Sequence, residues 1–306
     1  MHPITGLLTA LGVLTVVYIG GWVRYVLAAR RQPGGDDTPA TDARFPNLFQ
    51  ILLGAVTNFF DALGIGSFAT TTAVFRLNKM VPDRIIPGTL NAGHTLPTVV
   101  QAFAFTSVIP VDVLTLFAMI AAAVLGAWLG AGVVAGWPKR KIQIGMGIAL
   151  LAAATFMLMT QMKLFPEGSN EIGVRGVKLA LAVAGNFALG ALMTLGIGLY
   201  APCMVLVSLL GMSERTAFPI MMGSCAFLMP VGSLRFIREQ SYSLRNAVGL
   251  AIGGVFGVIL AVRFFTTLDI RTVRWLVIVV VVYTAITMLL SASRERDTRT
   301  AEIAKA

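Results

Sequence analysis

The tetrapeptide Leu63-Gly64-Ile65-Gly66 recurs 132 residues later as Leu195-Gly196-Ile197-Gly198, and this glycine repeat organises the interpretation of the whole chain. Short glycine matches arise by chance in apolar sequence, so one match alone has little weight. Further pairs nevertheless match at the same offset, in order and without a gap: Ala69 with Ala201, Met80 with Met212, Pro87 with Pro219, and Lys139 with Arg271. The shared register predicts an internal duplication.

The duplicated motif lies in a strongly apolar chain. Of the 306 residues, 57% are hydrophobic and 12% are charged, with a mean hydropathy of +0.82. A soluble domain of this length does not need so many apolar residues, so the excess must face lipid. Barrel strands are excluded because they are about 10 residues long and alternate in polarity. Apolar runs of the roughly 20 residues that a helix needs to cross a bilayer recur at 4–23, 48–75, 85–108, 111–136, 142–162, 177–210, 217–234, 247–262 and 273–290.

We therefore predict an all-α polytopic membrane protein with an extra span before the repeats. The first run lacks a basic leader and a cleavage pattern, so it is interpreted as a retained helix. Each half then has a long segment broken by Gly-x-Gly, a second segment interrupted by proline (Pro87 and Pro97; Pro219 and Pro230), and two unbroken spans. The predicted parts are an N-terminal transmembrane helix at 1–28, a solvated linker at 29–44, repeat 1 at 45–162, a connecting loop at 163–176, repeat 2 at 177–292 and a cytoplasmic tail at 293–306.

The distribution of basic residues predicts the topology. If each broken segment is a re-entrant hairpin, each half makes three net crossings and the second half is inverted. Of the 24 Lys and Arg residues, 17 then lie on one side of the membrane and 7 on the other. If the broken segments crossed fully, the loops at 76–84 and 139–141 would lie opposite the loop at 24–44. The positive-inside bias favours the inverted hairpins, with the N-terminus outside and the C-terminus cytoplasmic, in the inner (plasma) membrane.

The two glycine breaks are the candidate site for an anion. Irregular backbone at membrane depth must line protein or a watery cavity, and the short helix after each break offers N–H groups and a positive dipole end. The alternative is that Gly-x-Gly only allows close helix packing. The predicted substrate-binding residues are Gly64, Gly66, Ser67, Thr70, Thr71, Asn91 and His94 in the first half, and Gly196, Gly198, Tyr200, Cys203 and Ser224 in the second.

Two titratable residues are candidates for proton coupling. Asp61 lies inside an apolar segment, three residues before the first glycine break, and a charge there costs about 2.5 to 3.5 kcal/mol, so it either relays protons or caps and holds the hairpin. His94 precedes Pro97 and can titrate near neutrality, or it can be a neutral core histidine bonded to a carbonyl. Both cysteines, Cys203 and Cys225, lie in apolar segments and are interpreted as packing residues.

The sequence gives no sign of enzymatic chemistry. It contains no P-loop, no HExxH, no Gly-x-Ser-x-Gly and no paired intramembrane carboxylates, so we predict no catalytic residues, no metal and no cofactor. The net charge of +10 comes from short loop clusters, which excludes a nucleic-acid face. The predicted partners are a small inorganic or organic anion and the lipid bilayer, and a homodimer is retained as a candidate oligomeric state.

Two segments of the second half stand out, Leu195-Gly196-Ile197-Gly198-Leu199-Tyr200-Ala201-Pro202 and Leu209-Leu210-Gly211-Met212-Ser213-Glu214-Arg215-Thr216-Ala217. They resemble the TauE/SafE sulfite exporter family of anion permeases. The resemblance covers roughly residues 45 to 292. The first half carries Gly64-Ile65-Gly66 but has Thr70 where the family's proline is expected, and His94 is a further departure, so the identity of the anion is left open.

This resemblance implies export of sulfite or a related organosulfur or carboxylate anion, driven by an ion gradient. The leading hypothesis is a secondary transporter that works by alternating access about two inverted hairpins. A passive anion channel is the alternative, although few polar residues at membrane depth favour a continuous pore. A membrane enzyme and a scaffold without transport explain the sequence less well.

Overall fold

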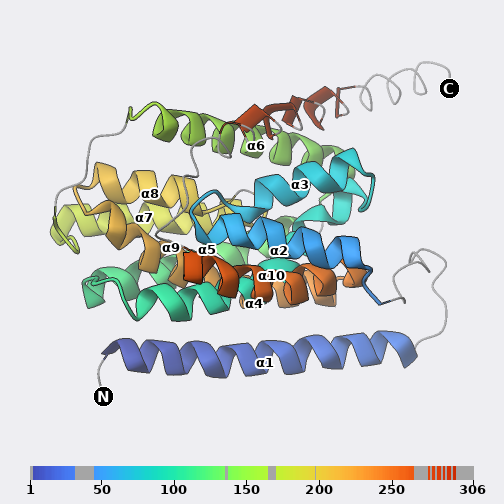
Figure 1. The fold of residues 1–306 in the computed structure, drawn as a ribbon, viewed down its shortest axis with the longest axis horizontal. Helices are drawn as coiled ribbons and strands as arrows, with labels where there is room; N and C mark the ends of the chain where they lie inside the picture. Colours follow the sequence, from blue (N-terminus) through green and yellow to red (C-terminus); the bar gives the residue numbers. More distant parts are fainter. Residues whose placement is uncertain are drawn as a thin grey trace.

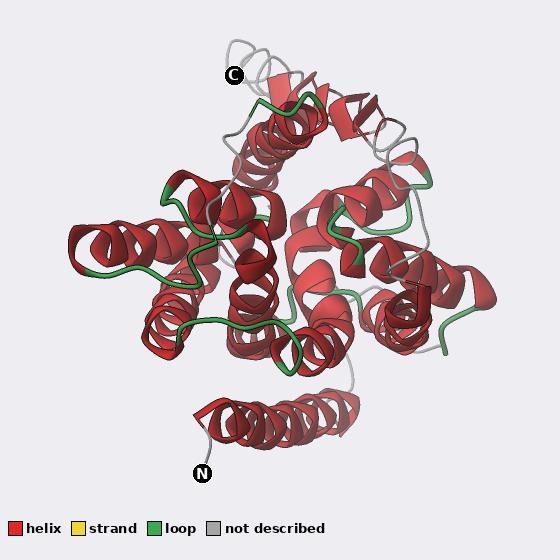
Figure 2. Cartoon of the chain, turned by 60° about the vertical axis from the view of Figure 1, so that its left-hand side comes forward, coloured by secondary structure: helices red, strands yellow, loops and turns green. Residues whose placement is uncertain are grey.

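The computed structural model describes residues 3–31, 45–134, 137–164, 170–196, 198–264 and separate positions between 275 and 293. Apart from one isolated bridge between Glu171 and Met212, the regular structure in these residues is helical (Figure 2). The elements are α1 (Pro3–Arg31), α2 (Leu48–Ala62), α3 (Ser67–Leu77), η2 (Asp83–Ile85), α4 (Ile86–Thr106), α5 (Val113–Val134), α6 (Lys139–Gln161), α7 (Gly176–Met193), α8 (Tyr200–Leu209), α9 (Glu214–Arg238) and α10 (Leu244–Phe264).

Six of these helices are long and apolar enough to cross a bilayer, namely α1, α5, α6, α7, α9 and α10. The predicted all-helical class is thereby confirmed, and six long apolar helices suggest a multi-pass membrane protein. With 11 and 10 residues, α3 and α8 are too short to cross a bilayer, since a spanning helix needs about 20.

Both glycine motifs end one helix and precede another. The first break separates α2 from α3 and the second separates α7 from α8. Gly64 has φ +87° and Gly196, its match at the 132-residue offset, has φ +91°. This left-handed conformation ends a helix and is available to glycine without a Cβ clash. The two matched glycines therefore perform the same backbone task.

The prolines do not interrupt the segments that follow, which corrects the sequence prediction. The helix α4 continues through Pro97, and α9 continues through Pro219 and Pro230. Pro87 lies in the first turn of α4, where its missing N–H would have no helical acceptor. Inside a packed bundle, neighbouring helices can satisfy the backbone groups that an internal proline frees.

The helices α4 and α9 pack together and run antiparallel. Thr95 near the middle of α4 contacts Ser233 with 3.2 Å between hydroxyl oxygens, whereas Phe105 near its end stacks on Phe218 near the start of α9. Around this pair, α2 and α4 pack against α10, while α7 and α9 pack against α5. Each of these two groups therefore contains two helices from one half of the chain and one helix from the other half.

Glycines bring the backbones of these groups into contact. A Cβ at Gly54 of α2 would lie 2.6 Å from the carbonyl oxygen of Leu250 in α10. A Cβ at Gly130 of α5 would lie 2.7 Å from the carbonyl oxygen of Ala191 in α7. Small residues allow this close approach of helices in membranes. No larger side chain fits at either position unless the helices separate.

The first helix lies along one edge of the bundle and α6 lies along the opposite edge (Figure 1). The Trp22 indole of α1 donates to the Tyr242 hydroxyl at 3.1 Å, and the Tyr18 hydroxyl donates to the Ala92 carbonyl at 3.3 Å. These bonds satisfy polar atoms that would otherwise be buried unpaired. They fasten α1 to α4 and to the loop between α9 and α10.

Candidate functional site

Asp61 lies in the last turn of α2, where its buried carboxylate faces the start of α3. One carboxylate oxygen accepts from the Ser67 backbone N–H at 2.6 Å, and the other accepts from the Gln101 side-chain amide at 2.7 Å. Among the described residues, no Lys or Arg bonds to this carboxylate. Asp61 therefore occupies the position at a helix N-terminus that an external anion would take.

Tyr200 connects this carboxylate to the second half of the chain. Its hydroxyl, in the first turn of α8, donates to the Gln101 side-chain carbonyl at 2.5 Å. Because the Gln101 carbonyl accepts from Tyr200 while its amide donates to Asp61, the orientation of the amide is set by its two partners. The result is a continuous hydrogen-bonded chain, Tyr200–Gln101–Asp61–Ser67, which we call the bridge. It joins the N-termini of α8 and α3.

His94 forms a second network within the first half. Its Nδ1 lies 3.0 Å from the Asn58 side-chain oxygen, and its Nε2 lies 3.1 Å from the Thr71 hydroxyl. The Asn58 amide nitrogen donates to the Gly54 carbonyl, so its oxygen is the acceptor for the imidazole. His94 Nδ1–H therefore donates to Asn58, and Nε2 accepts from Thr71. Both nitrogens of a neutral imidazole are satisfied in this arrangement.

The two networks include only part of the predicted site. Ser67, Thr71, His94 and Tyr200 join them, together with Asp61. The Thr70 hydroxyl instead bonds back to the Ser67 carbonyl of its own helix at 2.9 Å. Elsewhere, Asn91 donates to the Pro87 carbonyl, Ser224 accepts from Asn186 at 2.8 Å, and Cys203 is a buried free thiol.

The tips of the two breaks border open space. Among the described residues, apart from the immediate chain neighbours, no heavy atom would lie within 4 Å of a Cβ at Gly66 or at Gly198. The outer glycines are more confined, because a Cβ at Gly64 would meet Met204 at 4.0 Å and one at Gly196 would meet Met146 at 3.0 Å. The second glycine of each motif therefore has room beside it.

Two site residues, Gln101 and Asn58, were not predicted, although their spacing offers a signal. Asn58 lies one helical turn before Asp61, and the buried face of α2 carries both. Gln101 lies two turns after His94 on the buried face of α4. Polar residues at helical spacing from a buried acid or histidine share its face. In α2 and α4, this rule identifies Asn58 and Gln101 as further site residues.

The second half differs chemically at the position of Asp61. At the 132-residue offset, Asp61 matches Met193, whose sulfur lies 3.6 Å from the Cys225 sulfur. The N-cap residue of α8 is Leu199, whose apolar side chain cannot accept a hydrogen bond. The described residues contain no group of three His, Cys, Asp or Glu side chains that could hold a metal ion. Comparison with known protein families, with curated proteins and with solved structures finds no match to this chain.

Proposed function

We propose that this protein is a secondary transporter that exports a small anion by alternating access, with sulfite or a related organosulfur or carboxylate anion as its substrate. The bridge is the observation that carries the proposal, because it joins two short helices that begin at matched glycine breaks inside the bundle. Half-helix N-termini that meet at membrane depth are typical of transporter sites for anions.

The packing of α4 and α9 supports the proposal that the two halves are inverted repeats. These helices match in the chain at the 132-residue offset and run antiparallel along one another. Two matched helices related by an axis parallel to their length would instead run in the same direction. At the same offset α2 matches α7 and α5 matches α10. The contact between α2 and α10 therefore corresponds to the contact between α7 and α5.

The ends of the broken segments support the proposal of re-entrant hairpins. Asn47 at the start of α2 and Asn78 at the end of α3 line one cavity. In the second half, the Lys178 ammonium at the start of α7 donates to the Leu210 carbonyl at the end of α8 at 3.1 Å. Both contacts are expected if the chain returns to the side from which it entered the bundle.

Asp61 is the proposed coupling group, with His94 as the second candidate. While ionised, the Asp61 carboxylate holds the N-terminus of α3 and repels a second anion at the same place. Addition of a proton removes that charge, so that the helix dipole can attract the substrate. Binding of a proton and binding of an anion would then favour one another, which is the requirement for coupled movement.

Flux measurements in proteoliposomes test the proposal. Vesicles containing the full chain are loaded with sulfite, sulfate, acetate or propane-1-sulfonate, with and without a pH gradient. We expect saturable efflux of at least one anion that a pH gradient accelerates. Non-saturating flux that ignores the pH gradient would indicate a channel instead, and flux no higher than in protein-free vesicles would refute transport of these anions.

The proposed setting is the inner (plasma) membrane, with the N-terminus outside and the C-terminus cytoplasmic. The support is the unequal distribution of Lys and Arg between the loops. Single cysteines at positions 79 and 215, in a chain without its native cysteines, would report the two sides through impermeant labels. If both positions label from the same side, the inverted arrangement is wrong.

A further inference from the structure

The Arg235 guanidinium, at the end of α9, packs on the surface of α5. Its central carbon lies 5.9 Å from the centre of the Trp128 ring. A Cβ at Gly132 would lie 2.5 Å from the same carbon, so the absence of a side chain there makes room for the guanidinium. Arg235 is partly exposed, and Trp128 is 51% exposed. We call Trp128, Gly132 and Arg235 together the Arg–Trp site.

The hydrogen-bond donors of Arg235 are available to a further partner. A guanidinium has five N–H donors, and a cation–π contact with a ring uses none of them. Among the described residues, no carboxylate or other acceptor bonds to the Arg235 side chain. Glu239, one turn later in α9, is exposed and forms no ion pair with Arg235. The Arg–Trp site therefore carries a positive charge that no ion pair neutralises.

The Arg–Trp site lies at the end of an exposed apolar face of α5. Along this face, Leu125, Trp128, Leu129 and Val133 are exposed and recur at the spacing of one helix face. The helix α5 is long and apolar enough to cross a bilayer, so these side chains are expected to contact lipid tails. Gly132 belongs to the same face and lies in the last turn of α5. The guanidinium therefore lies where the apolar face meets the end of the helix.

The helices α5 and α9 end together at this site. A Cβ at Gly223 of α9 would lie 3.0 Å from the Ile120 side chain of α5. From Ile120 to Gly132, and from Gly223 to Arg235, the spacing is 12 residues, so the two helices run parallel. Both helices end within one turn after the site. Tryptophan and arginine at the ends of membrane-spanning helices lie at the level of the lipid headgroups.

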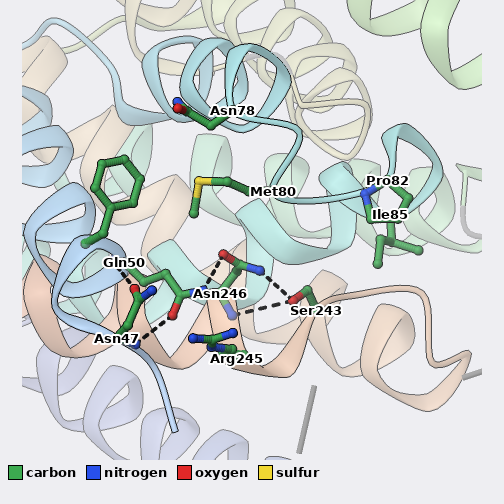
Figure 3. A pocket seen from close by; sticks show the side chains of 10 residues that line it. Asn47, Gln50, Asn78, Met80, Pro82, Ile85, Ser243, Arg245 and Asn246 are labelled. Atoms are coloured by element: carbon green, nitrogen blue, oxygen red, sulfur yellow. Dashed lines mark hydrogen bonds between the residues drawn. The ribbon is translucent and has the colours of Figure 1, made fainter. Parts of the chain in front are cut away.

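Two neighbouring arginines have different surroundings. Arg245, in the first turn of α10, lies beside the polar side chains of Ser243 and Asn246 (Figure 3). Arg238, in the last turn of α9, is exposed. Arg235 instead lies against an apolar helix face that is open to lipid. Among these three arginines, Arg235 is the one in contact with a lipid-facing surface.

We propose that the Arg–Trp site binds the phosphate group of an anionic phospholipid, whose acyl chains lie along the exposed face of α5. A guanidinium binds phosphate through charge-assisted, often bidentate hydrogen bonds. Basic pockets between membrane-spanning helices bind anionic headgroups. The apolar face next to the guanidinium favours a lipid over a free phosphate, and the positive charge favours an anionic lipid over a zwitterionic one. This binding does not depend on the proposed transport function.

Native mass spectrometry of the full chain, in detergent with equal amounts of dioleoyl phosphatidylglycerol and dioleoyl phosphatidylcholine, tests the site. The acyl chains are identical, so a difference in retention reports the headgroup. We expect the wild type to retain phosphatidylglycerol in preference. Arg235→Gln should weaken phosphatidylglycerol binding by about tenfold, because it removes a charge-assisted contact. Arg263→Gln, which changes an exposed arginine in the last turn of α10, is the matched control and should keep the preference.

Gly132→Ala tests the geometry without any change of charge. The added methyl group would overlap the guanidinium, which is the flexible end of a long side chain and can move away without separating the helices. Alanine is also a better helix former than glycine, so the variant should fold. We expect it to lose the preference for phosphatidylglycerol as Arg235→Gln does. Equal retention of phosphatidylglycerol by the wild type and both variants would overturn the proposal, as would equal retention of the two lipids by the wild type.

Thermal unfolding in detergent distinguishes a lipid from free phosphate, which presents the same chemical group. A ligand that binds only the folded state stabilises it. Phosphatidylglycerol should therefore raise the unfolding temperature of the wild type more than that of Arg235→Gln. Inorganic phosphate added without phosphatidylglycerol should have the same small effect on both proteins. An Arg235-dependent rise with inorganic phosphate as large as the rise with phosphatidylglycerol would refute the lipid as the ligand.

Discussion

The helices α3 and α8 begin at matched glycine breaks, yet their N-termini meet different partners. The start of α3 is held by the Asp61 carboxylate, whereas α8 follows the apolar residue Leu199 and Met193 stands at the position that matches Asp61. The bridge then joins the two ends through Gln101 and Tyr200. The comparison teaches that two similar glycine breaks can differ in charge, with a carboxylate at one and an apolar side chain at the other.

The largest effects are expected at the tip glycines. A valine at Gly66 or Gly198 would project into the open space beside the break, so both variants should lose anion flux in proteoliposomes. The stabilities should differ: Gly66 has φ +89°, where a side chain costs about 1 to 2 kcal/mol, whereas Gly198 has no positive φ. Gly66→Ala and Gly198→Ala, compared by thermal unfolding in detergent, isolate this backbone contribution. Wild-type flux in both valine variants would remove the tips from the mechanism.

Asp61→Asn removes the charge at the start of α3, so that the first glycine break becomes neutral like the second. The amide keeps the size of the carboxylate and an oxygen acceptor for the Ser67 N–H, but it cannot exchange a proton. We expect anion binding to remain and the response of flux to an imposed pH gradient to disappear. Flux at the wild-type rate with unchanged pH dependence would make Asp61 a structural cap, and His94 would be the next group to test.

Tyr200→Phe cuts the bridge at its second-half end. The Gln101 side-chain oxygen would lose its 2.5 Å donor while remaining buried, which costs about 1 to 3 kcal/mol. We therefore expect a lower unfolding temperature in detergent and a slower flux with its pH response retained. Tyr283→Phe removes an exposed hydroxyl and serves as the matched control. Equal unfolding temperatures for the two variants would show that the bridge does not contribute to stability.

The smallest effect is expected at the ion pair between Asp112 and Arg175. The hydrogen bond from Arg175 holds the pKa of Asp112 below its usual range, despite partial burial. Ionised Asp112 therefore stabilises the fold above about pH 4, and this contribution is lost as the pH falls through the lowered pKa. Asp112→Asn should lower stability by less than about 1 kcal/mol at pH 7, because its partner Arg175 is largely exposed and solvent screens the pair. The difference from wild type, measured by thermal unfolding, should shrink in acid.

Much of the fold could be predicted because apolar runs and glycine breaks act locally. The breaks after Ala62 and Met193 lie where the glycine motifs predict them. The prolines misled the prediction, because Pro97 and Pro230 remain inside helices whose neighbours support them. The helix propensity of the local sequence does not include that support, because it comes from segments that are distant in the chain.

The candidate site was predictable only in part for the same reason. Asp61 and His94 stand out because they are titratable residues in apolar segments. Gln101 does not, since its importance depends on Tyr200, which lies 99 residues away in the chain. A sequence pattern can place Gln101 and Asp61 on buried helix faces, but only the packing of α8 against α4 through this hydrogen bond reveals the bridge.

The close glycine contacts between halves have a mechanical consequence. Because the backbones of α2 and α10 touch at Gly54, and those of α5 and α7 touch at Gly130, neither pair can slide or separate without losing many contacts. Each of these two pairs therefore moves as one unit that contains one helix from each half of the chain. A motion that separated the starts of α3 and α8 would break the bridge.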